Sequence, residues 1–168
     1  GLFTTVFAPY VTGPDFVGEL KDRGGWAAVN DAYDRYPAST EQVIHPDRYP
    51  DDTPVRVTVA DRSAADWERF DVDPEADTVG EASVYAMFWA NDQLGDHDRY
   101  DYVHPYSTGW DGDSVVPYRS DGEYGYVWRS EWDSPAEARE FADAYRDLLR
   151  SRDADVRGDG VFVIPDSD

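Results

Sequence analysis

The sequence contains no cysteine, and this absence excludes several kinds of site at once. Without thiols the chain can form no disulfide, no thiolate nucleophile and no zinc–thiolate centre. Cysteine usage gives no information on the cellular compartment, because a secreted protein from a salt-rich environment can also do without disulfides.

Long apolar runs and clustered basic residues are missing as well. No run of about 18 apolar residues occurs, so we expect no insertion into a membrane. Only 15 basic residues stand against 36 acidic ones, and the arginines are scattered singly among aspartates. Nucleic-acid binding needs a basic stripe that displaces phosphate counterions, so we expect no nucleic-acid partner.

Acidic residues are what the sequence has in excess, with a net charge of -21 on 168 residues. Aspartate accounts for 27 of the acids, and Lys21 is the only lysine. At molar salt the screening length falls to about 3 Å, and such a surface becomes a hydrated coat instead of a source of self-repulsion. The composition predicts a protein of an extreme halophile. We expect it to be exported or at the cell surface, with a cytoplasmic location left open.

The N-terminal half of the sequence predicts helices followed by a loop and a strand. Apolar residues recur at helical intervals after Gly13-Pro14-Asp15, which predicts a short helix that ends at Gly24-Gly25. The same pattern resumes at once and predicts a second helix that ends before Pro37. Four prolines between residues 37 and 54 predict a long structured loop. Alternating valines predict a half-buried strand over residues 55–59, and a further helix is expected to begin at Asp77 or Thr78.

The C-terminal part gives the clearest pattern. A strand at residues 114–119, a turn at Asp121-Gly122 and a return strand at 124–130 predict a hairpin. Ser134-Pro135 opens an amphipathic helix, and residues 161–164 predict a last strand. Together these elements predict a single α+β domain over residues 1–168, with a mostly antiparallel sheet packed against several helices. The chain begins without methionine or a signal peptide, so we expect a fragment of a longer protein.

The densest cluster of functional residue types lies between Ser39 and Tyr49. Glu41 and His45 are four residues apart, so in a helical turn they would share a face and could hydrogen-bond or bind a metal ion. A structural interpretation is favoured. In it, Ser39 or Thr40 caps a short helical turn, the Glu41 side chain accepts a hydrogen bond from the backbone of this turn, and His45-Pro46 ends it. His45 is nevertheless the best titratable candidate in the chain.

Other candidate sites have equally plain structural interpretations. Glu81 fits a capping box with Thr78, which would explain it without any functional role. The sequence from Trp110 to Asp113 is similar to the opening of a calcium loop, but the later glycine and glutamate of such loops are missing, so a turn is favoured. Four aromatic residues could line an exposed sugar- or peptide-binding surface, or could cover the core: Tyr100, Tyr102, Tyr106 and Trp110.

Two stretches of the sequence together resemble a known family. The first contains Gly24-Gly25-Trp26, Ser39-Thr40-Glu41-Gln42 and His45-Pro46, and the second runs from Gly109 through Asp113 to the helix after Ser134. This pattern resembles the C-terminal half of a poorly characterised family of zincin-like metallopeptidases of bacteria and archaea. The resemblance implies an upstream helix carrying His-Glu-x-x-His, a motif that this sequence lacks, and it places a recurrent Gly-Glu of the family at Glu81. It therefore implies no catalytic residue, zinc ligand or cofactor within this chain.

Our interpretation is that the chain is the non-catalytic part of such a protein and forms one wall of a substrate cleft. Candidate contacts with a peptide or small ligand are Glu41, His45, Glu81, Trp110 and Asp113, and the expected partner is the upstream part that carries His-Glu-x-x-His. One alternative is a free-standing extracellular binding module with an aromatic surface. Another is a hydrolase whose metal site is built from His45, His97 and His104.

Overall fold

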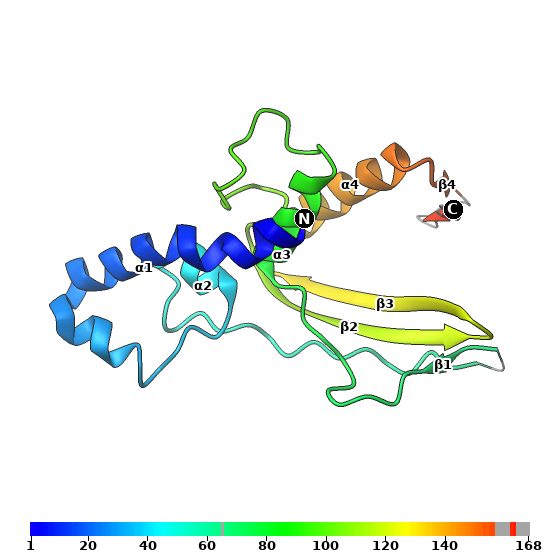
Figure 1. The fold of residues 1–168 in the computed structure, drawn as a ribbon, viewed down its shortest axis with the longest axis horizontal. Coiled ribbons are helices and arrows are strands. Elements are labelled where there is room, and N and C mark those ends of the chain that lie inside the picture. The colour runs from blue at the N-terminus through cyan, green and yellow to red at the C-terminus, as the bar shows by residue number, and fades with distance from the viewer. Residues whose placement is uncertain (65, 157–161, 164–168) are drawn as a thin grey trace.

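The computed structural model describes residues 1–64, 66–156 and 162–163 and shows an α+β fold (Figure 1). A three-stranded antiparallel sheet has the order β1-β2-β3, and four helices pack beside and above it. The prediction of the fold class is confirmed, although the sheet is small. The helices are α1 (Leu2–Asp31), α2 (Thr40–Ile44), α3 (Glu81–Ala90) and α4 (Pro135–Ser151); the strands of this sheet are β1 (Glu68–Arg69), β2 (Trp110–Ser120) and β3 (Glu123–Trp132).

Helix α1 is longer than predicted. It begins at Leu2 instead of near residue 13, because its first turns bury Ala8 in an apolar cluster with Tyr85 of α3. This packing offsets the cost of two prolines inside the helix. The predicted break at Gly24-Gly25 is confirmed as a kink, where Gly25 has a φ of 65° that side chains disfavour.

The predicted strand at residues 55–59 is wrong, because these residues run extended beside β2 without joining the sheet. A single backbone hydrogen bond of 2.7 Å joins the amide of Val55 to the carbonyl of Asp111. Gly112 permits this close approach, since a side chain there would overlap the carbonyl of Val55. The edge strand that pairs with β2 is instead β1, through Glu68 opposite Arg119.

The hairpin of β2 and β3 is confirmed, and both strands are longer than predicted. Asp121 and Gly122 have positive φ values of 38° and 94°, which a tight hairpin turn requires. The turn expected at residues 110–113 is wrong, because these residues begin β2 and carry a β-bulge between Trp110 and Gly112. Of the predicted last strand, residues 162–163 form β5 (Phe162–Val163), which pairs with β4 (Asp155–Val156), and residues 161 and 164 lie outside the described residues.

Helix α4 begins as predicted, with the Ser134 hydroxyl accepting a hydrogen bond of 3.3 Å from the amide of Glu137. Its Phe141 stacks on Trp132 of β3, with ring centroids 4.7 Å apart. Phe141 also contacts Phe88 of α3, so α4 and α3 share one apolar cluster. The sheet, α3 and α4 are thereby held together as one core.

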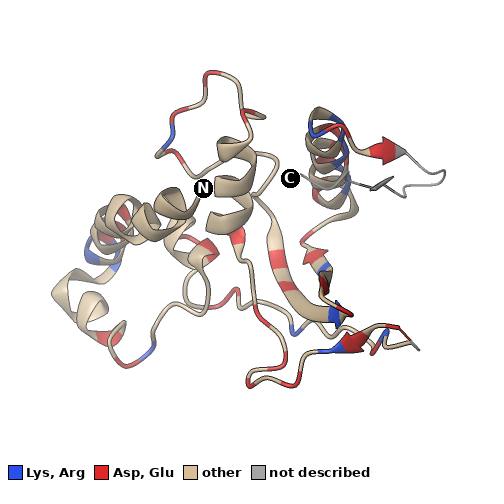
Figure 2. Cartoon of the chain, turned by 45° about the vertical axis from the view of Figure 1, so that its right-hand side comes forward, with Lys and Arg blue, Asp and Glu red and all other residues tan. Residues whose placement is uncertain are grey.

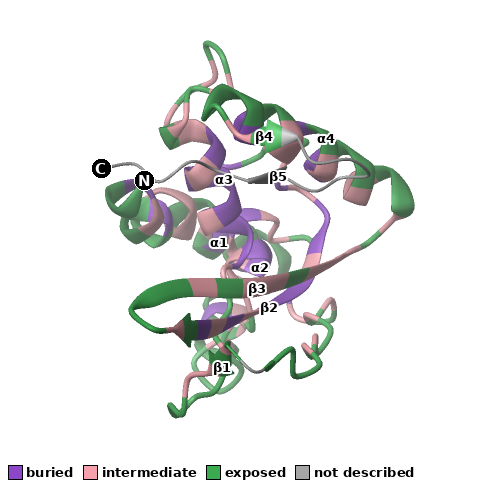
Figure 3. Ribbon diagram, turned by 90° about the vertical axis from the view of Figure 1, so that its right-hand side faces the viewer, coloured by how far each residue is buried: buried purple, intermediate pink, exposed green. Residues whose placement is uncertain are grey.

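Helix α3 is the centre of the molecule. Val84 and Phe88 belong to the apolar cluster shared with α4, and Ala82 and Tyr85 belong to the cluster shared with α1. Figure 3 shows that buried residues concentrate on α3, α2 and the first half of β2. The first residue of α3, Glu81, is therefore placed in the interior of the protein.

Acidic residues are distributed over helices, strands and loops alike, with the few basic residues interspersed among them (Figure 2). The acidic residues are therefore not confined to one element of the fold. Among the residues that the structure describes, no helix is both long and apolar enough to cross a membrane.

Candidate functional site

Two fully buried carboxylates form the centre of the candidate site. Glu41 is 1% exposed and Glu81 is not exposed at all, although both are ionisable groups that are costly to bury unpaired. They are linked to His45, Arg48 and Asp133, and we call these five residues the carboxylate cluster. Glu41 lies on α2, His45 and Arg48 follow α2, Glu81 begins α3, and Asp133 follows β3.

The local structure of α2 fixes the position of Glu41. The Ser39 hydroxyl accepts a hydrogen bond of 3.3 Å from the amide of Gln42, as predicted, whereas the Glu41 side chain accepts from Arg48 and not from the backbone of the turn. The Thr40 hydroxyl accepts a hydrogen bond of 3.2 Å from the amide of Ala82, which ties α2 to the first turn of α3. The helix ends at His45, also as predicted, and the next turn presents Arg48 to Glu41.

Arg48 joins three carboxylates from separate parts of the chain. Its Nη1 lies 2.5 Å from Glu41 Oε1, 2.5 Å from Asp133 Oδ2 and 3.4 Å from Asp52 Oδ2. Burial alone would lower the pKa of Arg48. The hydrogen bond to Asp133 and the nearby negative charges outweigh burial and raise this pKa above its usual range. Arg48 is therefore a permanent positive charge that holds α2 to the end of β3.

The pKa of Glu41 is raised from 4.5 to about 8. Burial is the largest cause, because it disfavours the charged form. Arg48 opposes the shift, whereas Glu81, Asp133 and Asp52 add to it. Glu41 consequently carries a proton at neutral pH even though it contacts an arginine.

Glu81 has a different environment. Its Oε1 lies 2.9 Å from His45 Nε2, and its Oε2 has no hydrogen-bond partner among the described residues. Burial raises the pKa of Glu81, and the hydrogen bond with His45 partly opposes this. Glu81 and His45 thus form a second hydrogen-bonded pair beside Glu41 and Arg48.

The capping box predicted for Glu81 and Thr78 is wrong. Gly80 precedes α3, and no side-chain cap comes from within this segment. Instead, Asp113 accepts hydrogen bonds of 2.8 Å from the amide of Val79 and 3.0 Å from the amide of Gly80. With the start of α3 satisfied from elsewhere, the Glu81 side chain is free to point to His45.

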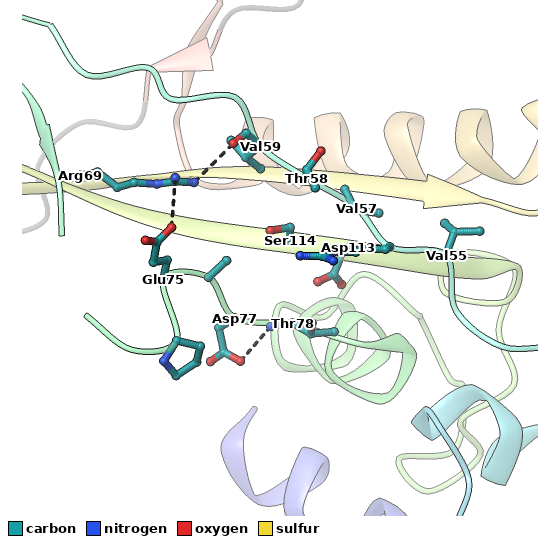
Figure 4. A pocket seen from close by; sticks show the side chains of 13 residues that line it. Val55, Val57, Thr58, Val59, Arg69, Glu75, Asp77, Thr78, Asp113 and Ser114 are labelled. Atoms are coloured by element: carbon teal, nitrogen blue, oxygen red, sulfur yellow. Dashed lines mark hydrogen bonds and ion pairs between the residues drawn. The ribbon is translucent and has the colours of Figure 1, made fainter. Parts of the chain in front are cut away.

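Two predicted ligand contacts have structural roles instead. Trp110 is 2% exposed and belongs to the main apolar cluster, and its Nε1 donates a hydrogen bond of 2.8 Å to Asp113 Oδ2. Asp113 lines a cavity of about 470 Å³ between the extended segment 55–59 and residues 74–78 (Figure 4), but its two oxygens already accept three hydrogen bonds. Of its two predicted interpretations, Trp110 fits the second, in which it packs over the core, and Asp113 anchors the start of α3.

The three histidines are not gathered into a metal site. His97 and His104 pack edge to face, with ring centroids 5.0 Å apart, whereas His45 is bound to Glu81. Burial, followed by the charge of His97, lowers the pKa of His104. Within the described ranges, no group of three or more histidine, aspartate or glutamate residues is placed to hold a metal ion. The proposed aromatic surface is incomplete as well, because Tyr102 is 1% exposed.

Sequence analysis found Glu41, His45 and Glu81 but missed Arg48 and Asp133. Arg48 looked like one of many arginines beside an aspartate, and Asp133 lies 85 residues further along the chain. No local pattern predicts that these two side chains meet. Only the fold, which brings the end of β3 to the turn after α2, shows it.

A family model described as "Domain of unknown function (DUF8575)" matches residues 68–168, which is more than half of the chain. The chain belongs to the DUF8575 family. No curated protein and no solved structure matches it. The DUF8575 region contains Glu81 and Asp133, whereas Glu41, His45 and Arg48 precede it. The carboxylate cluster is therefore assembled from the family region and the segment before it.

Proposed function

We propose that this DUF8575 protein forms one wall of a peptide-binding cleft in a zincin-like hydrolase. In this cleft the carboxylate cluster would bind and release a proton. The observation that carries this proposal is the pair of buried carboxylates, Glu41 and Glu81, held apart by different partners. Burial raises the pKa of both carboxyl groups, and groups with strongly perturbed proton affinity are characteristic of acid–base sites. The resemblance of residues 24–49 and 109–141 to zincin-like metallopeptidases supplies the class of reaction.

The cluster is arranged so that a bound ligand would meet it from outside. Glu41 and Glu81 are enclosed, whereas the side chains of Arg48 and Asp133 are 19% and 30% exposed. A ligand that contacts Arg48 or Asp133 would change the charge next to Glu41 and so shift its proton affinity. A general acid or base works best when its pKa lies near the operating pH, which suits a group with a pKa of about 8.

We further propose that the acidic surface suits a salt-rich environment. Acidic residues occur in helices, strands and loops along the chain (Figure 2), so screening by salt would relieve repulsion in many parts of the molecule. Binding measurements therefore belong in about 2–3 M KCl, where the screening length is near 3 Å or shorter.

The test is to titrate the ¹⁵N-labelled protein with N-acetyl-pentaalanine amide, a neutral probe of peptide-backbone recognition. We expect saturable shifts of the backbone amides of His45, Asp47, Arg48 and Asp133. The affinity of the Glu41→Gln variant should change less between pH 6 and 9 than that of the wild-type protein, with the remainder due to Glu81. As a matched control, Glu68→Gln removes an exposed carboxylate on β1 and should retain the wild-type pH dependence.

Two results would contradict the proposal. One is the absence of saturable binding to the neutral peptide. The other is peptide hydrolysis by this chain alone that is abolished by His97→Ala or His104→Ala, because that would favour a complete hydrolase built on its own histidines.

A further inference from the structure

One face of helix α1 exposes a row of apolar side chains, which are those of Leu2, Phe3, Val6, Phe7, Tyr10 and Val17. The opposite face of the helix, with Thr4, Ala8 and Phe16, is buried against the rest of the protein. We propose that the exposed face binds the same face of a second copy of this chain. This goes beyond the peptide-binding function and does not depend on it, because none of these residues belongs to the carboxylate cluster.

The exposed residues have the spacing of a helix–helix interface. Five positions of α1 are separated alternately by three and four residues, which is the repeat of paired helices: Phe3, Val6, Tyr10, Gly13 and Val17. The backbone of α1 departs from helical geometry only at Gly24 and Gly25, so these positions form one row on a continuous stretch of helix. The helix extends away from the sheet toward one end of the molecule (Figure 1), which leaves room for a partner helix beside it.

The exposed area of this face is large enough to hold a pair of copies together. Phe3 and Tyr10 are 71% and 76% exposed, and an enclosed aromatic side chain buries about 150–250 Å². In a symmetric pair, these two residues of each copy would contribute roughly 400–700 Å² of the about 1,200–2,000 Å² that stable interfaces bury. Four further apolar residues of the face can supply the remainder: Leu2, Val6, Phe7 and Val17.

The distribution of charge selects a second copy as the partner. The chain has a net charge of -21, but residues 1–14 contain no acidic, basic or histidine side chain. Two acidic copies repel each other, so they approach with the least repulsion through a face that carries no charge. This face offers no ion-pairing group to a charged partner, whereas a second copy presents the identical apolar row, as a two-fold symmetric interface requires.

An antiparallel arrangement centred on Tyr10 fits the sizes of the side chains. Phe3 of one copy then lies at the level of Val17 of the other, and Val6 lies at the level of Gly13. Among the residues that the structure describes, a Cβ atom at Gly13 would meet no heavy atom within 4 Å outside its own turn of the helix. The open space beside this glycine can therefore receive a side chain from the other copy.

The acidic residues of α1 favour the same arrangement. Asp15 and Glu19 are the first charged residues of the helix. In the antiparallel pair they come to the level of uncharged residues at the start of the other helix. A parallel pair would bring each of them to the level of its own counterpart, and like charges at an interface are unfavourable.

The test is sedimentation equilibrium of the whole chain in about 2–3 M KCl, where the screening length is near 3 Å or shorter. We expect a reversible dimer. Tyr10→Glu places two like charges at the centre of the pair and should weaken dimerisation about tenfold or more. Tyr124→Glu is the matched control, because Tyr124 on β3 is also 76% exposed, and it should leave dimerisation unchanged.

Cross-linking tests the arrangement without adding charge. The chain has no cysteine, so single cysteines can be introduced one at a time. Oxidation of Tyr10→Cys by diamide should give a disulfide-linked dimer, whereas Tyr124→Cys should stay unlinked. A mixture of Phe3→Cys and Val17→Cys should cross-link, but neither of these variants should cross-link by itself.

Several results would overturn the proposal. The first is a monomer at every concentration together with no cross-linking of Tyr10→Cys. The second is an equal loss of dimer in Tyr10→Glu and Tyr124→Glu. The third is binding of a monomer to phosphatidylcholine vesicles that Tyr10→Glu abolishes, because the face would then be a lipid-binding surface. Cross-linking of Phe3→Cys to itself would overturn the antiparallel arrangement.

Discussion

Replacing Glu41 by glutamine should remove a large part of the pH dependence of folding stability. The pKa of Glu41 is about 8 in the folded protein, against 4.5 for the free side chain. Because the folded state holds the proton more tightly, the contribution of Glu41 to the free energy of unfolding is complete below about pH 4.5 and is lost as the pH rises through about 8. The sign is opposite to that of a carboxylate stabilised by a salt bridge.

The size of the effect follows from the same two values. The difference between 4.5 and about 8, at 1.36 kcal/mol for each pH unit, corresponds to roughly 5 kcal/mol between pH 4.5 and pH 9. Glutamine has the shape of the protonated carboxyl group and cannot ionise. We therefore expect Glu41→Gln to match the wild-type protein near pH 5 and to exceed its stability by several kcal/mol at pH 9.

The assay is urea denaturation at a fixed 2–3 M KCl, followed by tryptophan fluorescence from pH 5 to pH 9. Urea is uncharged, so it leaves the ionic strength constant. Some loss of stability with rising pH should remain in the variant, because burial also raises the pKa of Glu81. If the free energy of unfolding of the wild-type protein and of Glu41→Gln changes with pH in parallel, the argument is refuted. Glu68→Gln, which changes an exposed carboxylate on β1, is the control and should follow the wild-type curve.

Two further substitutions test the contacts that position the cluster, again by urea denaturation. Arg48→Gln should lower the free energy of unfolding by about 3 kcal/mol, because Glu41, Asp52 and Asp133 lose the hydrogen-bonding cation that they share. Arg150→Gln, which breaks an exposed pair, should change it by at most about 0.5 kcal/mol. Asp113→Ala should cost roughly 3 kcal/mol, since two backbone amides at the start of α3 and the indole of Trp110 lose their acceptor. Asp77→Ala, which loses one exposed hydrogen bond, should cost less than about 1 kcal/mol. Equal effects within either pair would contradict the corresponding assignment.

The elements that were predicted correctly are those whose signals are local. The turn at Asp121-Gly122 and the cap at Ser134 depend on residues next to them, and both are confirmed. The errors arose where distant contacts decide the structure. Helix α1 begins early because Ala8 is buried against α3. Residues 55–59 lie against the start of β2 without forming a strand, and the strand that pairs with β2 is β1, which is opposite Tyr118 and Arg119.

In the candidate site, too, the features with local signals could be predicted and the distant contacts could not. Glu41 and His45 could be selected from their spacing, and the end of α2 at His45 was predicted correctly. The partners that determine their chemistry could not be selected, because Glu81 is 36 residues from His45 and Asp133 is 85 residues from Arg48. Protonation states depend on burial and on such partners, so they could not be derived from the order of residues alone.

Burying several carboxyl groups together is energetically unfavourable, and this is an argument that the carboxylate cluster has a function. Buried ion pairs are often replaceable by apolar residues without loss of stability, so they are weak evidence for a purely stabilising role. Here the carboxylates outnumber the cations, and one of them keeps a proton at neutral pH. If the cluster served only to hold α2 against β3, Arg48 with a single carboxylate would be sufficient. If the cluster is functional, changing Glu41 and Glu81 together to glutamine should raise stability at alkaline pH and abolish the pH-dependent binding of peptides. A double variant that keeps this binding would show that the cluster is structural.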